Sequence, residues 1–140
     1  MWVWVSMFAA ICWGLSYVSV EHVLKTADKF SYLFFISFAN CLIYLSLALY
    51  NGKLHTLQPL MSNSKWLILI IAASVIGNFL TISAVQLKSA THAAAIEISY
   101  PIWCALFVYL LFGHFPITWK SAIGLVFIVV GTVIFVLNEK

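Results

Sequence analysis

Five long apolar stretches, separated by short polar connections, constrain this chain more than any other feature. Each is close to the roughly 20 residues that an α-helix needs to cross a bilayer. The stretches cover about residues 2–25, 30–50, 66–87, 91–112 and 119–137. We therefore expect an all-α integral membrane protein with five transmembrane helices, forming a single membrane domain over residues 1–140. Because five is odd, we expect the N and C termini on opposite sides of the membrane.

The composition agrees with lipid as the solvent of most of the chain. Hydrophobic residues make up 64% of it and charged residues only 8%, against roughly 25% charged residues in a soluble domain. The net charge is +3, and the seven basic residues, all lysines, are spread along the sequence. Because they form no basic stripe, nucleic acid is not an expected partner.

The connections carry residues that begin or end helices. Asn51-Gly52 predicts the end of the second helix, since both residues tolerate a left-handed conformation. The segment 53–65 is the only extended polar loop that we expect. Ser89 or Thr91 can cap the start of the fourth helix, and residues 116–118, Pro-Ile-Thr, prepare the start of the fifth.

A single carboxylate interrupts the fourth apolar stretch. Glu97 lies about two turns into it, four residues before Pro101, and Gly113 is expected to end the helix. An ionised carboxylate at that depth is costly, so we expect Glu97 to be protonated, paired or bathed by water in a cavity. Because Pro101 has no N–H to offer the carbonyl of Glu97, we expect a helix kink there. A structural hydrogen bond and a snorkelling acid are the alternatives to a functional role.

Four further residues are candidates to bind substrate or protons with Glu97. Tyr100 follows it by three positions, and Trp13 and Tyr17 share one face of the first helix. The amide of Asn78 would be costly against hydrocarbon, so we expect it to face another helix or a wet cavity. Helix packing is the alternative for the first helix, and an interhelical hydrogen bond is the alternative for Asn78.

The fifth stretch carries small residues on one face. Ser121, Gly124 and Gly131 repeat at helical spacing. Glycine within a helix costs about 1 kcal/mol relative to alanine, and close approach of another helix is the usual gain that offsets it. We expect this face to pack against a helix of the same chain or to form a dimer interface.

The distribution of the lysines predicts almost no preference for one orientation of the chain in the membrane. With five spans, the N-terminal side of the membrane receives Lys53, Lys65 and Lys120. The other side receives Lys25, Lys29, Lys88 and Lys140. Three against four is nearly no bias under the positive-inside rule. Insertion in both orientations would permit an antiparallel pair, a two-chain version of the inverted repeats within single-chain transporters. The alternative is one orientation set by a partner chain or by weak biases.

The order of these features resembles an EamA-type repeat of the drug/metabolite transporter superfamily. The likeness rests on the run 84–95, on Pro101 and Gly113, on the spacing Gly124–Gly131, and on Trp13-Gly14 in the first helix. It covers nearly the whole chain. The chain is also similar to the four-helix small multidrug resistance proteins, with one helix more.

The resemblance implies a half-size transporter. Full-length relatives carry two such repeats in inverted orientation, whereas this chain has one, which would pair as an antiparallel homodimer or with a second half. Two positions depart from the patterns. His114 stands where the EamA pattern usually has glutamate, and the first helix lacks the glutamate of the small multidrug resistance proteins. The role of Glu97 therefore rests on the physical argument alone.

We expect a secondary transporter that exports small metabolites or cationic drugs by alternating access as an antiparallel dimer, with proton coupling as a hypothesis. Half of a lipid-linked-sugar flippase and a non-transporting membrane subunit are the alternatives. No catalytic triad spacing, phosphate loop or paired carboxylate is present, so an enzyme, a cofactor and a metal site are not expected. We expect the inner (plasma) membrane of a bacterium or archaeon.

Overall fold

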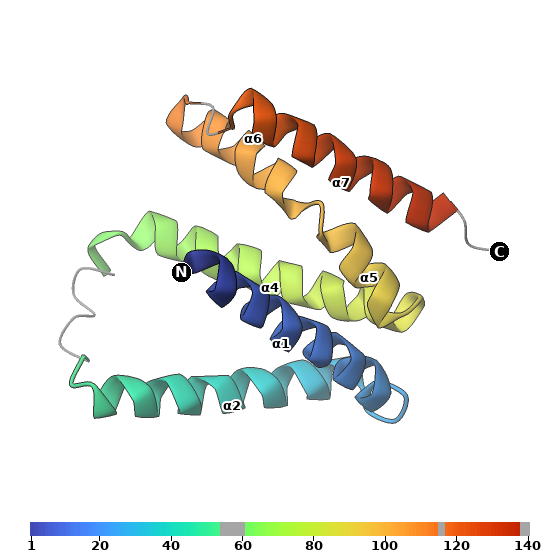
Figure 1. Cartoon of the computed structure of the whole chain (residues 1–140). Coiled ribbons are helices and arrows are strands. Elements are labelled where there is room, and N and C mark those ends of the chain that lie inside the picture. Colours follow the sequence, from blue (N-terminus) through green and yellow to red (C-terminus); the bar gives the residue numbers. More distant parts are fainter. Residues whose placement is uncertain (54–60, 115–116, 138–140) are drawn as a thin grey trace. The chain divides into compact units, whose positions relative to one another are not determined.

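A computed structural model describes residues 1–53, 61–114 and 117–137. This part of the chain is helical and contains no strand (Figure 1). Its helices are α1 (Trp2–Val23), α2 (Lys29–Tyr50), α4 (Ser64–Leu87), α5 (Ala90–Glu97), α6 (Tyr100–Phe112) and α7 (Trp119–Leu137). Residues 54–60 of the expected polar loop, and Pro116, lie outside the described residues.

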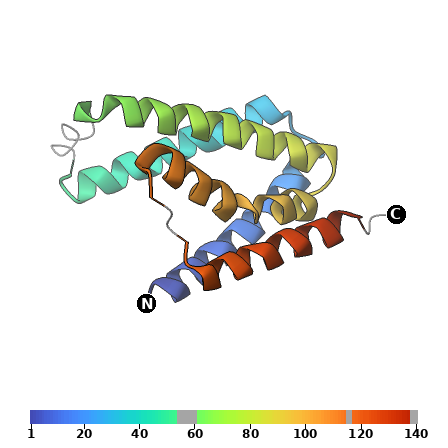
Figure 2. The same cartoon turned by 90° about the horizontal axis from the view of Figure 1, so that it is seen from above.

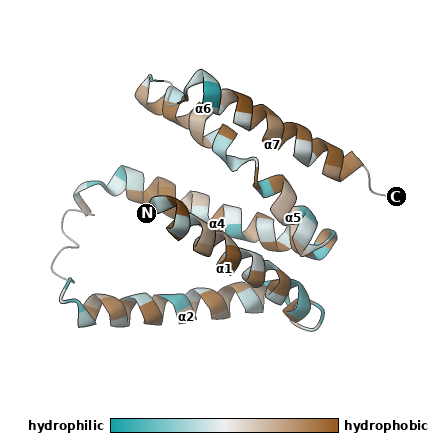
Figure 3. Cartoon of the chain, viewed as in Figure 1, coloured by the Kyte–Doolittle hydropathy of each residue, from teal (hydrophilic) through white to brown (hydrophobic). Residues whose placement is uncertain are grey.

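The expected all-α membrane fold is confirmed. Within the described ranges, five helical segments are long and apolar enough to cross a membrane, with α5 and α6 together forming the fourth. Their large apolar side chains are mostly exposed, far beyond what a soluble monomer shows. Figure 3 shows apolar residues along the helices and hydrophilic ones at their ends and at the α5–α6 connection. The chain is therefore an integral membrane protein.

The helix ends follow from local chemistry. The Asp28 carboxylate caps α2 by accepting hydrogen bonds from the backbone N–H groups of Phe30 (2.9 Å) and Ser31 (3.0 Å). The predicted stop after α2 is confirmed, because Gly52 has φ +61° directly after the helix. Ser89 caps α5, as predicted, by accepting from the N–H of His92.

The helices group into two compact units. One comprises Met1–Val18 with Lys88–Lys140, and the other comprises Ser19–Leu87. The expectation of one domain over residues 1–140 stays a prediction.

In the unit Ser19–Leu87, α2 and α4 run antiparallel (Figures 1 and 2). Lys29, at the start of α2, joins them. Its Nζ lies 4.7 Å from the ring centroid of Phe79 and donates to Ser83 Oγ at 3.4 Å. The ring of Phe30 lies 5.8 Å from that of Phe79. Cation–π contacts of this kind hold a charged group against an apolar helix.

In the other unit, α7 runs antiparallel to α5 and α6 (Figures 1 and 2). Two contacts fix α5 against α7. The Thr132 hydroxyl donates to the carbonyl of Ala95 at 3.3 Å, and the ring centroids of His92 and Phe135 are 5.1 Å apart. This unit also contains the first part of α1, and hence most of the candidate site.

Candidate functional site

The fourth membrane segment is two helices rather than one kinked helix. A turn at Ile98 and Ser99 separates α5 from α6 (Figure 1). Across it the backbone bonds shorten to an i to i−3 pattern. The Ser99 N–H donates to the carbonyl of Ile96 at 3.1 Å, and the Ile102 N–H donates to that of Ser99 at 3.0 Å. The disruption expected at Pro101 is thus a complete break.

Proline chemistry accounts for the position of the break. Pro101 lies in the first turn of α6, where a helix tolerates a residue without an N–H. It cannot donate to the carbonyl of Glu97. The second helix begins at Tyr100, directly before the proline, and Ile98 and Ser99 form the turn.

The break redirects a backbone carbonyl toward α7. Because the Ser99 N–H bonds Ile96, it is not directed at the carbonyl of Ala95, its partner in a continuous helix. The Thr132 hydroxyl lies 3.3 Å from the Ala95 carbonyl and 2.9 Å from the carbonyl of Ile128, so the two carbonyls share its single proton. Backbone polar groups at membrane depth need a partner within the protein, and Thr132 offers the Ala95 carbonyl a shared one.

Glu97, the last residue of α5, is paired with a side chain of α1. The Tyr17 hydroxyl donates a hydrogen bond to Glu97 Oε2, and both side chains are half-buried. A hydrogen bond that a carboxylate accepts is roughly twice as strong as one between neutral groups. Pairing is one of the three states expected for a carboxyl group in this position.

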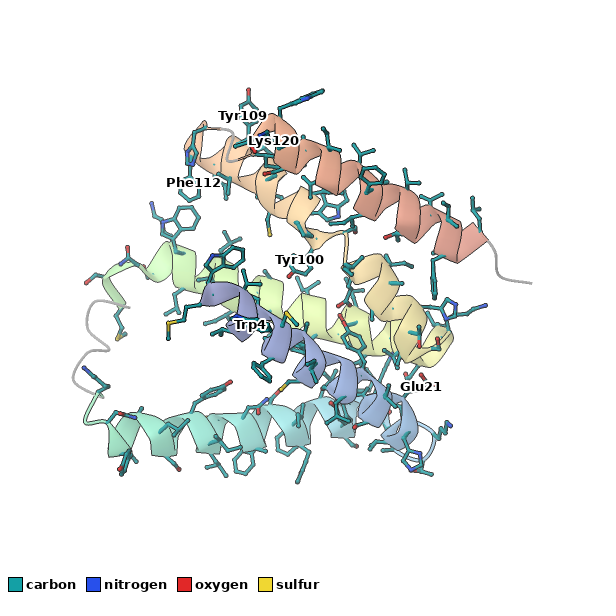
Figure 4. The ribbon with its side chains drawn as sticks, in the orientation of Figure 1. Trp4, Glu21, Tyr100, Tyr109, Phe112 and Lys120 are labelled. Carbon is teal, nitrogen blue, oxygen red and sulfur yellow. The ribbon has the colours of Figure 1, made fainter. Side chains whose placement is uncertain are left out.

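Two aromatic candidates lie on the elements that carry this pair. Trp13 precedes Tyr17 by one turn of α1 and is 63% exposed. Tyr100 projects from the first turn of α6, directly after the break, and is 64% exposed (Figure 4). The structure therefore joins Tyr17 to Glu97 by a direct contact. A shared binding role for Trp13 and Tyr100 stays a prediction.

Asn78 belongs to the unit Ser19–Leu87. Its amide donates to the carbonyl of Ser74, one turn earlier in α4, at 2.8 Å. The amide thus has a partner on its own helix, which lowers the cost of its exposure to lipid. A role in the substrate site stays a prediction.

The small-residue face of α7 is exposed. A methyl group added at Gly124 or Gly131 would meet no described atom within 4 Å apart from the nearby helix backbone. The hydroxyl of Ser121 lies 2.9 Å from that of Thr118, at the start of the helix. The described part of the chain therefore leaves the two glycine positions open, and a dimer interface at this face stays a prediction.

The sequence interpretation missed two features of this region. One is the contact of Thr132 with α5. The available signal for it was a hydroxyl directly after Gly131 in an otherwise apolar run. The other is the pairing itself, because Tyr17 and Glu97 are 80 residues apart and helical periodicity relates only neighbours on one helix.

The sequence model of the EamA-like transporter family matches residues 1–137. No curated protein matches the chain, and no solved structure does. The family match spans all of the described helices and confirms the resemblance that the order of the motifs predicts. The chain belongs to the EamA-like transporter family, a family of membrane transporters.

Proposed function

We propose that this member of the EamA-like transporter family is a secondary transporter that exports small organic cations in exchange for protons, with Glu97 as the group that binds each in turn. The observation that carries the proposal is the carboxylate of Glu97, placed at a break in a membrane segment and bonded to Tyr17 of another helix. A carboxylate within a membrane span marks a substrate or proton path by default.

The break supports a binding role because it supplies polar groups where a continuous helix has none to offer. Discontinuous membrane helices form the substrate and ion sites of many secondary transporters. Here the break directly follows Glu97 and leads into Tyr100 and Pro101. An acid in this position can hold a proton in one state and a cation in the other, which is the requirement for exchange.

We also propose that a second five-helix unit completes the transport path, with an antiparallel second copy as the favoured partner. Transporter sites lie at the interface of two inverted repeats, and the near balance of lysines permits both orientations of this chain. The open glycine face of α7 offers a surface for close helix approach. The plasma membrane of a bacterium or archaeon is the proposed location.

Transport in proteoliposomes tests the role of Glu97. Tetramethylammonium serves as the probe, because it carries a permanent charge and does not cross lipid as a neutral amine. We expect protons that flow down an imposed pH gradient to drive tetramethylammonium in the opposite direction through the wild-type protein. Glu97→Gln should lower this flux at least about tenfold, since the amide carries no charge. Glu97→Asp, which keeps the charge on a shorter side chain, should retain part of it.

Glu21→Gln is the matched control, because it removes a carboxylate from the last turn of α1 in the other unit. Its flux should equal that of the wild type. Unchanged proton-driven flux in folded Glu97→Gln would contradict the proposal. Wild-type flux no greater than that of protein-free vesicles would favour a non-transporting subunit.

A further inference from the structure

We infer that Tyr17 acts as an internal competitor of the substrate: its hydroxyl occupies the carboxylate of Glu97 in the empty transporter, and the cation must displace it. Tyr17 is then a positioning residue that sets the affinity of the site. This inference rests on the proposed role of Glu97 as the cation-binding group.

The first support is the contact itself. The hydroxyl of Tyr17 donates directly to Oε2 of Glu97 and occupies that side of the carboxylate. A cation that takes the same position has to displace the hydroxyl. The hydrogen bond lost in that step is one to a charged group, and such bonds are the stronger class in proteins.

The second support is that α5 is held independently of Tyr17. Thr132 contacts the carbonyl of Ala95, and the ring of Phe135 lies against that of His92, so both links join α5 to α7. Ser89 caps the other end of α5. Removing the Tyr17 hydroxyl should therefore leave Glu97 in the same position. The hydroxyl can also be displaced from Glu97 without a movement of α5.

The third support is the cost of an empty site. Each hydrogen bond that a half-buried carboxylate accepts lowers the cost of its burial, and the Tyr17 hydroxyl supplies one when no cation is bound. The same bond must be broken during binding, so it lowers substrate affinity. Lower substrate affinity of this kind favours transport, because the substrate has to leave the site as well as enter it.

The sign of the effect separates this role from the two simpler ones. If Tyr17 were a ligand of the cation, removing its hydroxyl would weaken binding. If it only supported the fold, removing its hydroxyl would weaken binding or leave it unchanged. A competitor alone predicts tighter binding in Tyr17→Phe.

Titration calorimetry with tetramethylammonium on the purified full chain in detergent provides the test. It is done at the same pH for every variant. We expect Tyr17→Phe to bind about tenfold more tightly than the wild type, as the loss of one hydrogen bond to a charged group implies. Tyr44→Phe, which removes an exposed hydroxyl from α2, should bind like the wild type.

The double variant Tyr17→Phe with Glu97→Gln completes a cycle. The hydroxyl should have no effect on affinity once the carboxylate is gone, so the tighter binding should disappear. Tyr17→Leu is a second way to remove the hydroxyl if Tyr17→Phe does not fold, and it should also bind more tightly than the wild type.

Unchanged or weaker binding in folded Tyr17→Phe, with binding that still depends on Glu97, would overturn this inference alone. Equal affinity of Glu97→Gln and the wild type would overturn the proposed function and this inference together. The two failures are therefore distinguishable in one set of titrations.

Discussion

Thr132 illustrates what one hydroxyl contributes inside an apolar helix. Its Oγ1 lies within hydrogen-bond distance of a carbonyl on its own helix and of the Ala95 carbonyl on α5. Valine in its place would keep the shape and lose both contacts. In lipid, where water is absent, such a group substitutes for solvent at a backbone irregularity. The Thr132 hydroxyl therefore supports the end of α5 at Glu97, within an otherwise apolar part of the chain.

Gly113 has an equally local role. It ends α6 with φ +71°, and its N–H donates to the carbonyl of Tyr109 at 2.9 Å. Alanine in this left-handed conformation costs roughly 1–2 kcal/mol. We expect Gly113→Ala to lower the free energy of unfolding by about 1 kcal/mol and Gly113→Asn to lower it less, because asparagine tolerates the conformation.

Unfolding in mixed micelles by increasing dodecyl sulfate measures this difference. Gly14→Ala is the control, since Gly14 lies within α1 without a positive φ and a methyl group there meets nothing within 4 Å. It should be neutral or slightly stabilising. Equal losses for Gly113→Ala and Gly113→Asn would show that backbone conformation is not the cause.

Among the elements, the α5–α6 segment is where sequence and structure differ most. The sequence predicts one helix over 91–112 with a kink, because a proline inside an apolar run removes one hydrogen bond. The structure instead has two helices with a turn between them. The turn is accompanied by a contact of the Ala95 carbonyl with the Thr132 hydroxyl of α7, a tertiary contact that no local rule contains. Where local rules suffice, at Gly52 and Ser89, the predicted helix ends are confirmed.

Restoring the missing N–H should rejoin the two helices. In Pro101→Ala, residue 101 can donate to the carbonyl of Glu97, and alanine has the highest helix propensity. We expect amide hydrogen exchange at residues 98–100 to slow by about tenfold or more relative to the wild type. Cation binding should weaken, because the carbonyl of Glu97 would then be held by the N–H of residue 101.

Pro101→Gly is the matched variant for this prediction. It also restores the N–H, but glycine costs about 1 kcal/mol relative to alanine in a helix. Protection of the amides of residues 98–100 should therefore rank Ala above Gly and Gly above the wild type. Equal protection in all three proteins would mean that the turn does not depend on proline.

For the whole molecule, the near balance of lysines predicts that small changes of charge decide the orientation. In Lys53→Gln with Lys65→Gln, the N-terminal side keeps only Lys120 against four lysines on the other side. The positive-inside rule then places the N terminus outside the cytoplasm. Lys25→Gln with Lys88→Gln and Lys140→Gln leaves three lysines on the N-terminal side against Lys29 alone and should place the N terminus inside.

Reporters fused near each end of the chain measure this directly. The wild type should give signals from both orientations, and each of the two charge variants should give mainly one orientation, the two being opposite. A wild type that already shows a single orientation would contradict dual insertion and favour a partner of different sequence.

The candidate site itself was only partly predictable, since Glu97 and Tyr17 were identifiable from position but not as partners.

The short length of α5 has a consequence for how the protein is made. Its eight residues extend about 12 Å as a helix, far less than the roughly 30 Å hydrocarbon core, so α5 must enter the bilayer together with α6. Synthesis proceeds from the N terminus, and Tyr17 precedes Glu97 by 80 residues. The hydroxyl is therefore already in the membrane when the carboxylate leaves the ribosome. Of these two side chains, the carboxyl group is the more costly to insert into lipid. It is synthesised second, after the tyrosine that becomes its hydrogen-bond partner.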